Sequence, residues 1–515
     1  MMNLLTSLAD EEVAMETGFA GESRRAPVAG LWIGVDLGTS LIKALIMSSR
    51  GRVLSPDGHR SRFATVATPW KTDGTADPEA FVARVAAAIG DALGAVADES
   101  GQAHVEGLAL TGFGESGVLI EPDGSVRMPV IPWYDRRGDA QAAALPAGLA
   151  DEFVRRTGLF LDAQASVATL LWWQAQGHRV SPGSRWLSIP EWVAYRLGGE
   201  ALAEPSLASR TGLLDIDAET EHGLFTEFLP EGLLPPLRRA GVPAGAVSGQ
   251  AARAVGLPQI AGAVLSVAGH DHAVCALGAG CTGPDDLLNE AGTADVLVRS
   301  VPAGTVPPQH RGLLAAAGVE TGCHAVPGRQ VLIGGVRAGL TLRRLAALLG
   351  AGTDGAGTDG ARDAQGEPLF AGGPIDLRAA ELAAIPDDLE VVGVANDVDQ
   401  VVIRLRDHAS PEALWLAGAR AAAAETARLL GVLEEAAGPH ARAVATGGWT
   451  RSATVRRAKR DIMPHLTFSA DPDAGATGAA LIAGHAARSA DAPLVDWIGD
   501  WMTRMTRQGE EHHSG

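Results

Sequence analysis

Cysteine, basic residues, aromatic residues and long apolar runs are all scarce in this chain of 515 residues. Three cysteines, Cys275, Cys281 and Cys323, are too few and too odd in number for a disulfide framework, which favours a reducing compartment. The 42 basic against 61 acidic residues give a net charge of −19, which argues against nucleic acid and acidic membrane surfaces as partners. No apolar stretch approaches the roughly 20 residues needed to cross a bilayer, so we expect a cytoplasmic protein.

The length and the 46% of hydrophobic residues predict two or more domains, each with its own core. Residues 1–30 are acidic and have no basic start before an apolar run, so we expect a flexible leader and not a secretory signal. The segment Gly350–Asp354 recurs as Gly355–Asp359, and this low-complexity stretch is typical of a disordered surface loop. Residues after Trp501 have the character of a tail, which we extend to residues 490–515.

The segment Leu31–Val66 reads as strand, turn, strand, because apolar residues alternate on both sides of the turn Gly38-Thr39-Ser40. A Walker-type phosphate loop would run from its glycines into a helix and would carry Gly-Lys-Ser/Thr. Both features are missing here, which excludes an ordinary P-loop.

Helices and strands alternate along the rest of the chain, which predicts an α/β protein. Helices are expected at Pro78–Val96 with Asp77 as N-cap, around Leu170–Trp173, and at Ile189–Leu197, Gly339–Leu349, Pro411–Ala437 and Gly475–Ala487. Strands are expected at Val105–Leu110, Val264–Ala268 and Ala441–Ala445.

The sequence Gly269-His270-Asp271-His272 follows the apolar run Ala263–Ala268, so a buried strand is expected to open there and to present one carboxylate. Such a carboxylate can accept the proton of an attacking hydroxyl, although a strand-end cap or turn is the simpler interpretation. Two more Gly/Thr turns follow apolar strands, at Glu290–Ala294 and at Ala445–Ser452. Together with Gly38–Ser40 they suggest one shared cradle for phosphate groups.

In this order, the motifs resemble those of the FGGY family of carbohydrate kinases, of the actin-like ATPase superfamily, over about Leu31–Ser489. The resemblance also rests on two stretches similar to the family's sugar-binding domain, Trp133–Arg137 and Ser206–Leu213. It implies an α/β fold of two ribonuclease-H-like domains with a cleft between them. The sugar-binding domain would span residues 31–279 and the nucleotide-binding domain residues 280–489.

The resemblance also implies ATP and Mg²⁺ as cosubstrate and cofactor, and a sugar or polyol as the small-molecule partner. Asp271 would be the catalytic base. The metal would be bound by Asp271 and, through water, by Asp36. The implied ATP contacts are Gly38, Thr39, Ser40, Lys43, Gly292, Thr293, Gly447, Gly448, Arg451 and Ser452. The implied substrate contacts are Glu115, Trp133, Asp135, Arg136, His270 and His272.

Several of these residues also have simpler structural interpretations. Asp36 could merely initiate a turn, and Lys43 could be a solvated strand residue. Asp135 and Arg136 could pair with each other or orient their loop. His270 and His272 could suggest zinc, but no cysteine or carboxylate cluster stands at ligand spacing beside them.

The position before Glu115 bears on the substrate. Glycerol kinases of the family carry an Arg-Glu pair there, whereas this chain has Gly114 before Glu115. We expect that the missing arginine leaves room, so that a ketose or a sugar alcohol with a longer carbon chain is preferred over glycerol. Other hypotheses are an actin-like assembly protein and a sugar-sensing regulator, and the sequence is compatible with a homodimer.

Overall fold

The computed structural model describes residues 30–49, 63–96, 104–292, 294–349, 374–387, 389–393, 400–406, 408–469, 471, 473–489 and 491–513, with side chains up to residue 504 in the last range. The expected leader before Gly30, the repeat Gly350–Asp359 and Thr293 lie outside the described residues.

The first sheet has the strand order β3-β2-β1-β4-β10-β9. Its strands are β1 (Leu31–Leu37), β2 (Leu41–Ser48), β3 (Phe63–Ala67), β4 (Val105–Gly112), β9 (Gly245–Ala246) and β10 (Val264–His270). Strands β1, β2 and β3 form an antiparallel meander, whereas β1, β4 and β10 run parallel. The central strands β1 and β4 are buried along almost their whole length, which explains their continuous apolar sequences. The meander and the turn that leads into a strand confirm the prediction for Leu31–Val66.

The second sheet repeats this plan with the order β13-β14-β12-β11-β17-β18. Its strands are β11 (Asp286–Ala291), β12 (Asp295–Pro302), β13 (Val319–Cys323), β14 (Arg329–Val336), β17 (Arg442–Thr446) and β18 (Thr467–Phe468). Strands β11, β12 and β14 are antiparallel neighbours, and β11, β17 and β18 are parallel. Each half of the chain therefore contains an antiparallel hairpin whose first strand also pairs, along its other edge, with a parallel strand.

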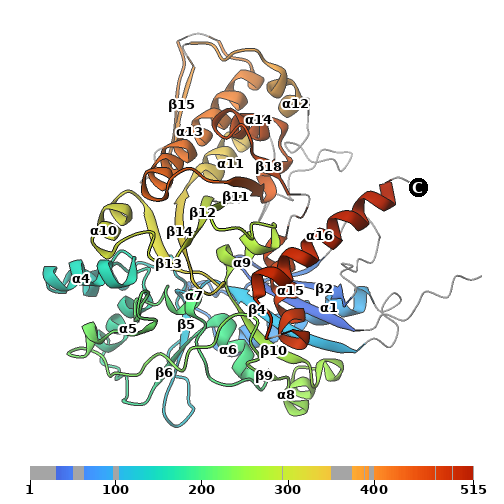
Figure 1. The fold of residues 1–515 in the computed structure, drawn as a ribbon. Coiled ribbons are helices and arrows are strands. Elements are labelled where there is room, and N and C mark those ends of the chain that lie inside the picture. Colours follow the sequence, from blue (N-terminus) through green and yellow to red (C-terminus); the bar gives the residue numbers. More distant parts are fainter. Residues whose placement is uncertain are drawn as a thin grey trace, which may run out of the picture.

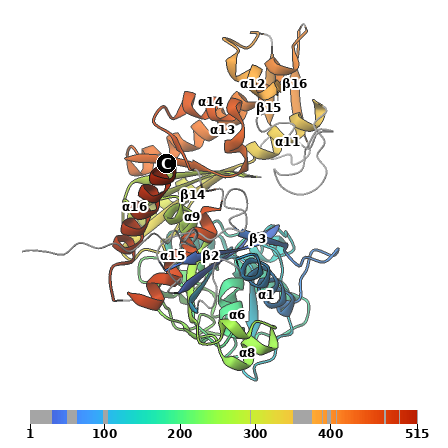
Figure 2. The same cartoon turned by 90° about the vertical axis from the view of Figure 1, so that its right-hand side faces the viewer.

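Two helices lie between the sheets, α9 (Asp271–Gly278) and α15 (Ala474–Arg488) (Figures 1 and 2). Helix α15 packs on β1, β4 and β10, and it also packs on α9. A Cβ on Gly278 would lie 1.9 Å from the Ala474 carbonyl oxygen, and one on Gly34 would lie 2.1 Å from the Ala476 oxygen. These glycines are therefore required for the close approach of α9, α15 and β1.

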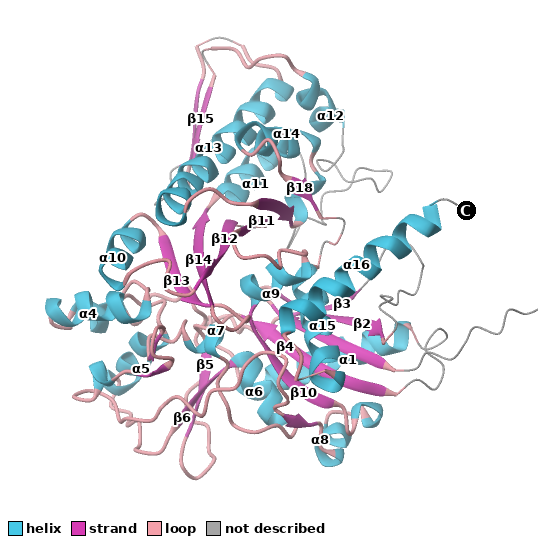
Figure 3. Cartoon of the chain, viewed as in Figure 1, coloured by secondary structure: helices cyan, strands magenta, loops and turns pink. Residues whose placement is uncertain are grey.

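Other helices cover the outer faces, as Figure 3 shows. Near the first sheet are α1 (Pro78–Ala95), α6 (Ile189–Arg196), α8 (Gly249–Ala254) and η2 (Pro258–Ile260), and near the second are α11 (Ala338–Leu348), α12 (Pro374–Glu381), α13 (Pro411–Ala437), η3 (Gly448–Arg451) and α14 (Ala453–Ile462). The hairpin of β15 (Glu390–Gly393) and β16 (Val401–Arg404) projects beyond α13 (Figure 3). Helices begin where the sequence predicted, since the Asp77 side chain accepts a hydrogen bond from Glu79 N and Ser410 caps the helix that starts at Pro411.

A long insertion between β4 and β9 carries the predicted sugar-binding stretches. It contains β5 (Gly117–Ile120), α3 (Asp139–Ala143), α4 (Ala147–Thr157), α5 (Ser166–Ala175), β6 (Arg185–Ser188), α7 (Pro205–Ala208), β7 (Leu214–Asp215), β8 (Thr220–Glu221) and η1 (Gly223–Phe225). It packs against α10 (Pro308–Ala316) and β13 of the second half. Buried Arg311 makes the link, because its guanidinium donates to the Arg155 carbonyl at 2.6 Å and to Asp217 at 2.6 Å.

The strands of the two sheets fall on either side of the predicted boundary at residues 279–280, whereas α15, from the predicted second domain, packs on the first sheet. The expected tail is wrong for much of its length. Residues Leu494–His513 form helix α16, and Leu494, Ile498 and Trp501 are buried. Trp497 and Trp501 pack around Trp32 of β1, with ring centroids 5.7 and 5.1 Å from it. Within the described ranges, no helix has both the length and the apolar character of a membrane span.

Candidate active site

Asp271 is the first residue of α9, directly after β10 ends at His270. The strand end is held from two sides, because Thr111 Oγ1 donates to the Gly269 carbonyl at 2.7 Å and Ser206 Oγ accepts from His270 N at 2.9 Å. Gly269 has φ +113°, which turns the chain out of the sheet. The Asp271 side chain keeps a quarter of its surface exposed, so its carboxylate can meet a substrate.

Asp36 lies on β1, just before the turn Gly38–Ser40, and it contacts the start of α15 from the other side. A Cβ on Gly475 would lie 2.9 Å from Asp36 Oδ2. The pKa of Asp36 is raised to about 7, mainly by burial; Asp271 and Glu290 add to the rise, and Lys43 opposes it. Asp36 Oδ1 is buried without a hydrogen-bond partner among the described residues.

These features of Asp36 fit a cation site. A buried carboxylate with a free oxygen and other carboxylates in its field is stabilised by a divalent cation, and Mg²⁺ takes few protein ligands and keeps several waters. Lys43 faces Asp36 across the hairpin, but its ammonium pairs with Asp473 at 2.7 Å. The implied contact of Lys43 with ATP therefore competes with an ion pair between a half-buried lysine and a buried aspartate.

The second Gly/Thr turn lies against the Gly-Gly turn that follows β17. Gly447 has φ +97°, and a Cβ there would lie 2.5 Å from the Ala291 carbonyl oxygen. This position therefore requires glycine, because the turn needs both a positive φ and a close backbone approach. Gly292 follows Ala291 directly, so the two turns bracket one site, while Thr293 lies outside the described residues.

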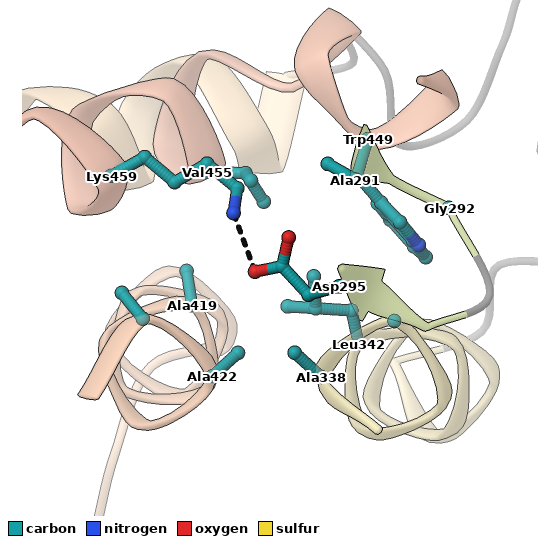
Figure 4. Close-up of a pocket in the computed structure, with 12 residues that line it drawn as sticks. Ala291, Gly292, Asp295, Ala338, Leu342, Ala419, Ala422, Trp449, Val455 and Lys459 are labelled. Atoms are coloured by element: carbon teal, nitrogen blue, oxygen red, sulfur yellow. Dashed lines mark hydrogen bonds and ion pairs between the residues drawn. The ribbon is translucent and has the colours of Figure 1, made fainter. Parts of the chain in front are cut away.

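A pocket opens beside these turns (Figure 4). Its walls are mostly small or apolar residues from α11, α13, η3 and α14, namely Ala338, Gly339, Leu342, Ala419, Ala422, Ala423, Trp449 and Val455. The polar lining comes from Asp295 and Lys459, whose buried side chains pair at 2.5 Å. Asn289 and Thr426 also donate to Asp295, at 2.5 and 2.6 Å, so its carboxylate is held by three donors.

Two implied ATP contacts at this site have other roles in the structure. Ser452 is buried, and its hydroxyl donates to Asp376 at 2.5 Å and caps α14 by accepting from Val455 N at 3.1 Å. Arg451 is exposed on η3, where its Nε donates to the Gly448 carbonyl at 3.4 Å. A contact of Ser452 with ATP would break a helix cap.

Glu115 lies in the short connection between β4 and β5, where it is buried beside Arg210. Arg210 Nε donates to Glu115 Oε1 at 2.8 Å, and Gly114 N donates to Oε2 at 3.1 Å. Burial alone would raise the pKa of Glu115, but the charge of Arg210 outweighs it and lowers the pKa to about 2. The expectation that Gly114 leaves this site without an arginine is therefore wrong, because a residue 95 positions further on supplies the guanidinium.

The residues of the Trp133–Arg137 stretch divide into two groups. Trp133 is half-buried, and its indole Nε1 donates to Thr39 Oγ1 at 2.9 Å, which connects the sugar side to the first phosphate turn. Asp135 does not pair with Arg136 but with Arg137, at 2.7 Å. Arg136 pairs at the surface with Asp139 and Asp162, at 2.7 and 3.0 Å. Asp135 and Arg136 thus make ion pairs within and beside their own loop, whereas Trp133 contacts the first phosphate turn.

His270 and His272 flank Asp271 and differ in charge. Burial lowers the pKa of His270 to about 4 despite Asp271 and Glu115, so it is neutral at pH 7. For His272, the effect of burial is outweighed by Asp271 and by Glu290, whose Oε2 lies 2.9 Å from His272 Nδ1, and the pKa rises to about 9. A cationic imidazole therefore stands beside the carboxylate of Asp271. No cluster of metal-ligating side chains that includes the two histidines is present in the described part of the chain.

Four residues of this site were missed from the sequence: Arg210, Glu290, Asp473 and Gly475. Arg210 and Glu290 stand inside stretches that were singled out as motifs, so a signal existed without a way to tell which side chain points inward. Asp473 precedes α15, a helix rich in small residues, and Gly475 lies in its first turn. Only the packing of α15 on β1 brings the two residues close to Asp36 and Lys43.

Comparisons with known proteins agree with this geometry. Residues 31–278 match the model of the FGGY family of carbohydrate kinases, N-terminal domain. These residues form an FGGY-family N-terminal domain. It is 26% identical to L-fuculokinase of Escherichia coli K12 over 314 residues, which are 59% of this chain and 63% of that one. It is 25% identical to xylulose kinase of the same organism over 305 residues, 58% of this chain and 59% of the relative.

Solved structures extend the likeness to the whole fold. The xylulose kinase of Rhodospirillum rubrum superposes with a TM-score of 0.72 at 22% identity, over 94% of this chain and 100% of that chain. The glycerol kinase of Plasmodium falciparum with ADP superposes with a TM-score of 0.73 at 14% identity, over 94% and 97%. Both halves of the molecule therefore have the fold of these kinases, and the two-domain actin-like ATPase fold implied by the sequence is confirmed.

Proposed function

We propose that this FGGY protein is an ATP-dependent kinase that transfers the γ-phosphoryl group to a hydroxyl of a ketose or sugar alcohol. The observation that carries the proposal is the position of Asp271. Its carboxylate stands at the start of α9, between the phosphate turns with Asp36 and the polar group of Glu115 and Arg210. The names of two relatives, L-fuculokinase and xylulose kinase, each contain a ketose and support this substrate class.

In the proposed reaction, Asp271 accepts the proton of the attacking hydroxyl as its oxygen bonds to the γ-phosphorus. The bond from that phosphorus to the bridging oxygen breaks, and ADP leaves with the electron pair. The backbone N–H groups of Thr39 and Ser40 would hold phosphate oxygens, since Gly38 N and Gly292 N already donate to the carbonyls of Leu41 and Ala294, at 3.0 and 2.9 Å. Trp133 keeps the first turn in place through Thr39. Mg²⁺, when bound through water by Asp36, would neutralise charge on the transferring group. Positioning contributes most of the rate, as in phosphoryl transfer generally.

The nucleoside is proposed to bind beside the turn of Gly447 and Gly448, at the pocket of Figure 4. Trp449 offers an indole at one wall of this pocket, on which a base can stack. Glu115 would accept hydrogen bonds from substrate hydroxyls, because its low pKa keeps it ionised at any working pH.

The test is an ADP-release assay on the full chain with xylulose, ribulose, fuculose, erythritol and glycerol as acceptors. Asp271→Asn should keep ATP binding and lose sugar phosphorylation by about 10²- to 10⁴-fold, as expected for a general base. Asp123→Asn, in an exposed turn, is the matched control and should keep full activity. Near-normal turnover by Asp271→Asn would remove the base assignment. Nucleotide-dependent filaments without any sugar phosphorylation would favour the assembly hypothesis instead.

A further inference from the structure

Arg210 is held between the two halves of the molecule. It follows α7 of the insertion, only 4% of its side chain is exposed, and its Nε donates to Glu115 at 2.8 Å. Its second terminal nitrogen donates to Glu320 on β13 of the second sheet, at 2.5 Å. One guanidinium therefore joins a carboxylate from each half, beside the residues that flank Asp271.

Gly114 makes this position of Arg210 available. A Cβ at residue 114 would lie 2.8 Å from Arg210 Cγ and 2.9 Å from its Cβ. These neighbours are the near part of the arginine side chain, next to the backbone, so they cannot move aside as a flexible end could. A side chain at residue 114 and the observed Arg210 conformation therefore exclude each other.

Two nitrogens of this group have no hydrogen-bond partner among the described residues. They are the remaining terminal nitrogen of Arg210, Nη1, and the ring nitrogen Nδ1 of His270, both buried. The other ring nitrogen of His270 lies 3.4 Å from Asp271, and the charges of Glu115 and Arg210 both act on this ring. Buried polar atoms are nearly always paired, so unpaired ones beside a reactive carboxylate indicate a place for a ligand's polar groups.

We propose that Arg210 is the substrate-binding arginine of this kinase, that Gly114 exists to admit it, and that the group formed with Glu115 and Glu320 selects uncharged polyhydroxy substrates over aldonates. This inference deepens the proposed function and rests on it. The arginine donates to substrate hydroxyls through Nη1 while the two glutamates neutralise it and accept from neighbouring hydroxyls.

The charges around the group give the selectivity its direction. Glu115 and Glu320 supply two carboxylates to the single guanidinium of Arg210, and the Asp271 carboxylate lies 3.4 Å from the neighbouring His270 ring. A carboxylate on the substrate would enter an already negative site, whereas hydroxyl groups can both donate and accept.

The decisive experiment exchanges the two positions. Arg210→Met should raise KM for the best ketose by about 10- to 100-fold, the loss expected for a hydrogen bond from a charged group, while ATP affinity stays within about twofold. Gly114→Arg alone should lose sugar binding through the clash. The double variant Gly114→Arg with Arg210→Gly should recover at least about tenfold of the lost kcat/KM. Arg238→Met, which removes a surface ion pair with Glu200, is the control and should change neither constant.

The outcomes separate the two proposals. If the wild type phosphorylates no sugar or polyol, the proposed function fails. If the wild type phosphorylates a sugar or polyol but Arg210→Met leaves the sugar KM unchanged, the inference about Arg210 is overturned and the proposed kinase function stands. The same holds if gluconate is a better substrate than any ketose or polyol. Arg210→Lys covers the case in which Arg210→Met does not fold, since it keeps the charge but not the three-nitrogen geometry. An unchanged sugar KM in Arg210→Lys contradicts the inference as well.

Discussion

A buried glutamate behind Asp271 gives a prediction about stability. Glu204 is fully buried at the start of α7, where its Oε2 accepts from Ser206 N at 2.8 Å and from Leu207 N at 3.2 Å. Its Oε1 has no partner in the described part of the chain. Ser206 Oγ in turn donates to this carboxylate and accepts from His270 N. Glu204 thus supports the strand end that presents Asp271, the proposed catalytic base.

The titration of Glu204 fixes the sign of the effect. Burial raises its pKa from 4.5 to about 8, against its hydrogen bonds, and neighbouring Glu191 adds repulsion. A group whose pKa is higher in the folded state contributes stability that is fully present below the unfolded pKa of 4.5 and is lost as the pH rises through about 8. At roughly 1.4 kcal/mol per pH unit, the loss between pH 5.5 and pH 8.5 is on the order of 3 kcal/mol.

Glu204→Gln should remove this pH dependence. The glutamine keeps an oxygen for the cap but places an unpaired amide N–H₂ at Oε1, which costs about 1–3 kcal/mol at every pH. The variant should therefore be less stable than the wild type at pH 5.5 and equal or more stable at pH 8.5. Urea unfolding followed by tryptophan fluorescence at both pH values measures the difference, and Glu231→Gln, at an exposed site, is the control.

The comparison isolates Glu204, because Asp36, Glu191 and His272 titrate in both proteins. A wild type and variant whose stabilities change in parallel from pH 5.5 to pH 8.5 would refute the reasoning. That result would mean that Glu204 is ionised in the folded protein throughout, with its three donors outweighing the cost of burial.

Two further substitutions test the residues proposed to hold phosphate. The methyl group of Gly475→Ala should push on the Asp36 carboxylate and lower kcat by at least about tenfold, with the melting temperature retained. Gly94→Ala, in open space on α1, is the control and should leave activity unchanged while adding up to about 1 kcal/mol of stability. Equal effects of the two substitutions on kcat would contradict the role given to Gly475. Trp133→Phe should lose the hydrogen bond to Thr39 and lower kcat/KM for ATP by about 3- to 10-fold, and unchanged steady-state constants would show that the first turn is held without it.

Local signals predicted much of the fold. The helix Pro411–Ala437 was predicted with both of its ends. Its start is marked by Ser410-Pro411, a signal that acts within one helical turn. The strand before Asp271 was found from its apolar run, although β10 extends two residues further. The prediction of a tail failed, although Leu494, Ile498 and Trp501 stand at the spacing of one helix face. Three apolar residues at this spacing do not show that the face is buried, because the surface that covers it is not visible in the sequence.

Side-chain partners far apart in the sequence could not be predicted in this way. Gly114 was expected to leave room for a longer substrate, and only the folded chain shows that Arg210 packs against it. Ser452 stands in a stretch typical of nucleotide binding, yet its hydroxyl is committed to Asp376, 76 residues earlier in the chain. In both cases the residue type was informative and the direction of the side chain was not.

The link between His272 and Glu290 explains how two sheets can serve one reaction. His272 follows Asp271 on α9, which continues from the first sheet, whereas Glu290 lies on β11 of the second sheet, two residues before Gly292. Their contact at 2.9 Å therefore ties the residue next to the base directly to the strand that carries the second phosphate turn. Because a charge-assisted hydrogen bond is short and directional, a shift of one sheet against the other changes the position of Asp271 relative to the phosphates. If the proposed reaction requires closure of the two halves, this imidazole would couple that closure to the position of Asp271.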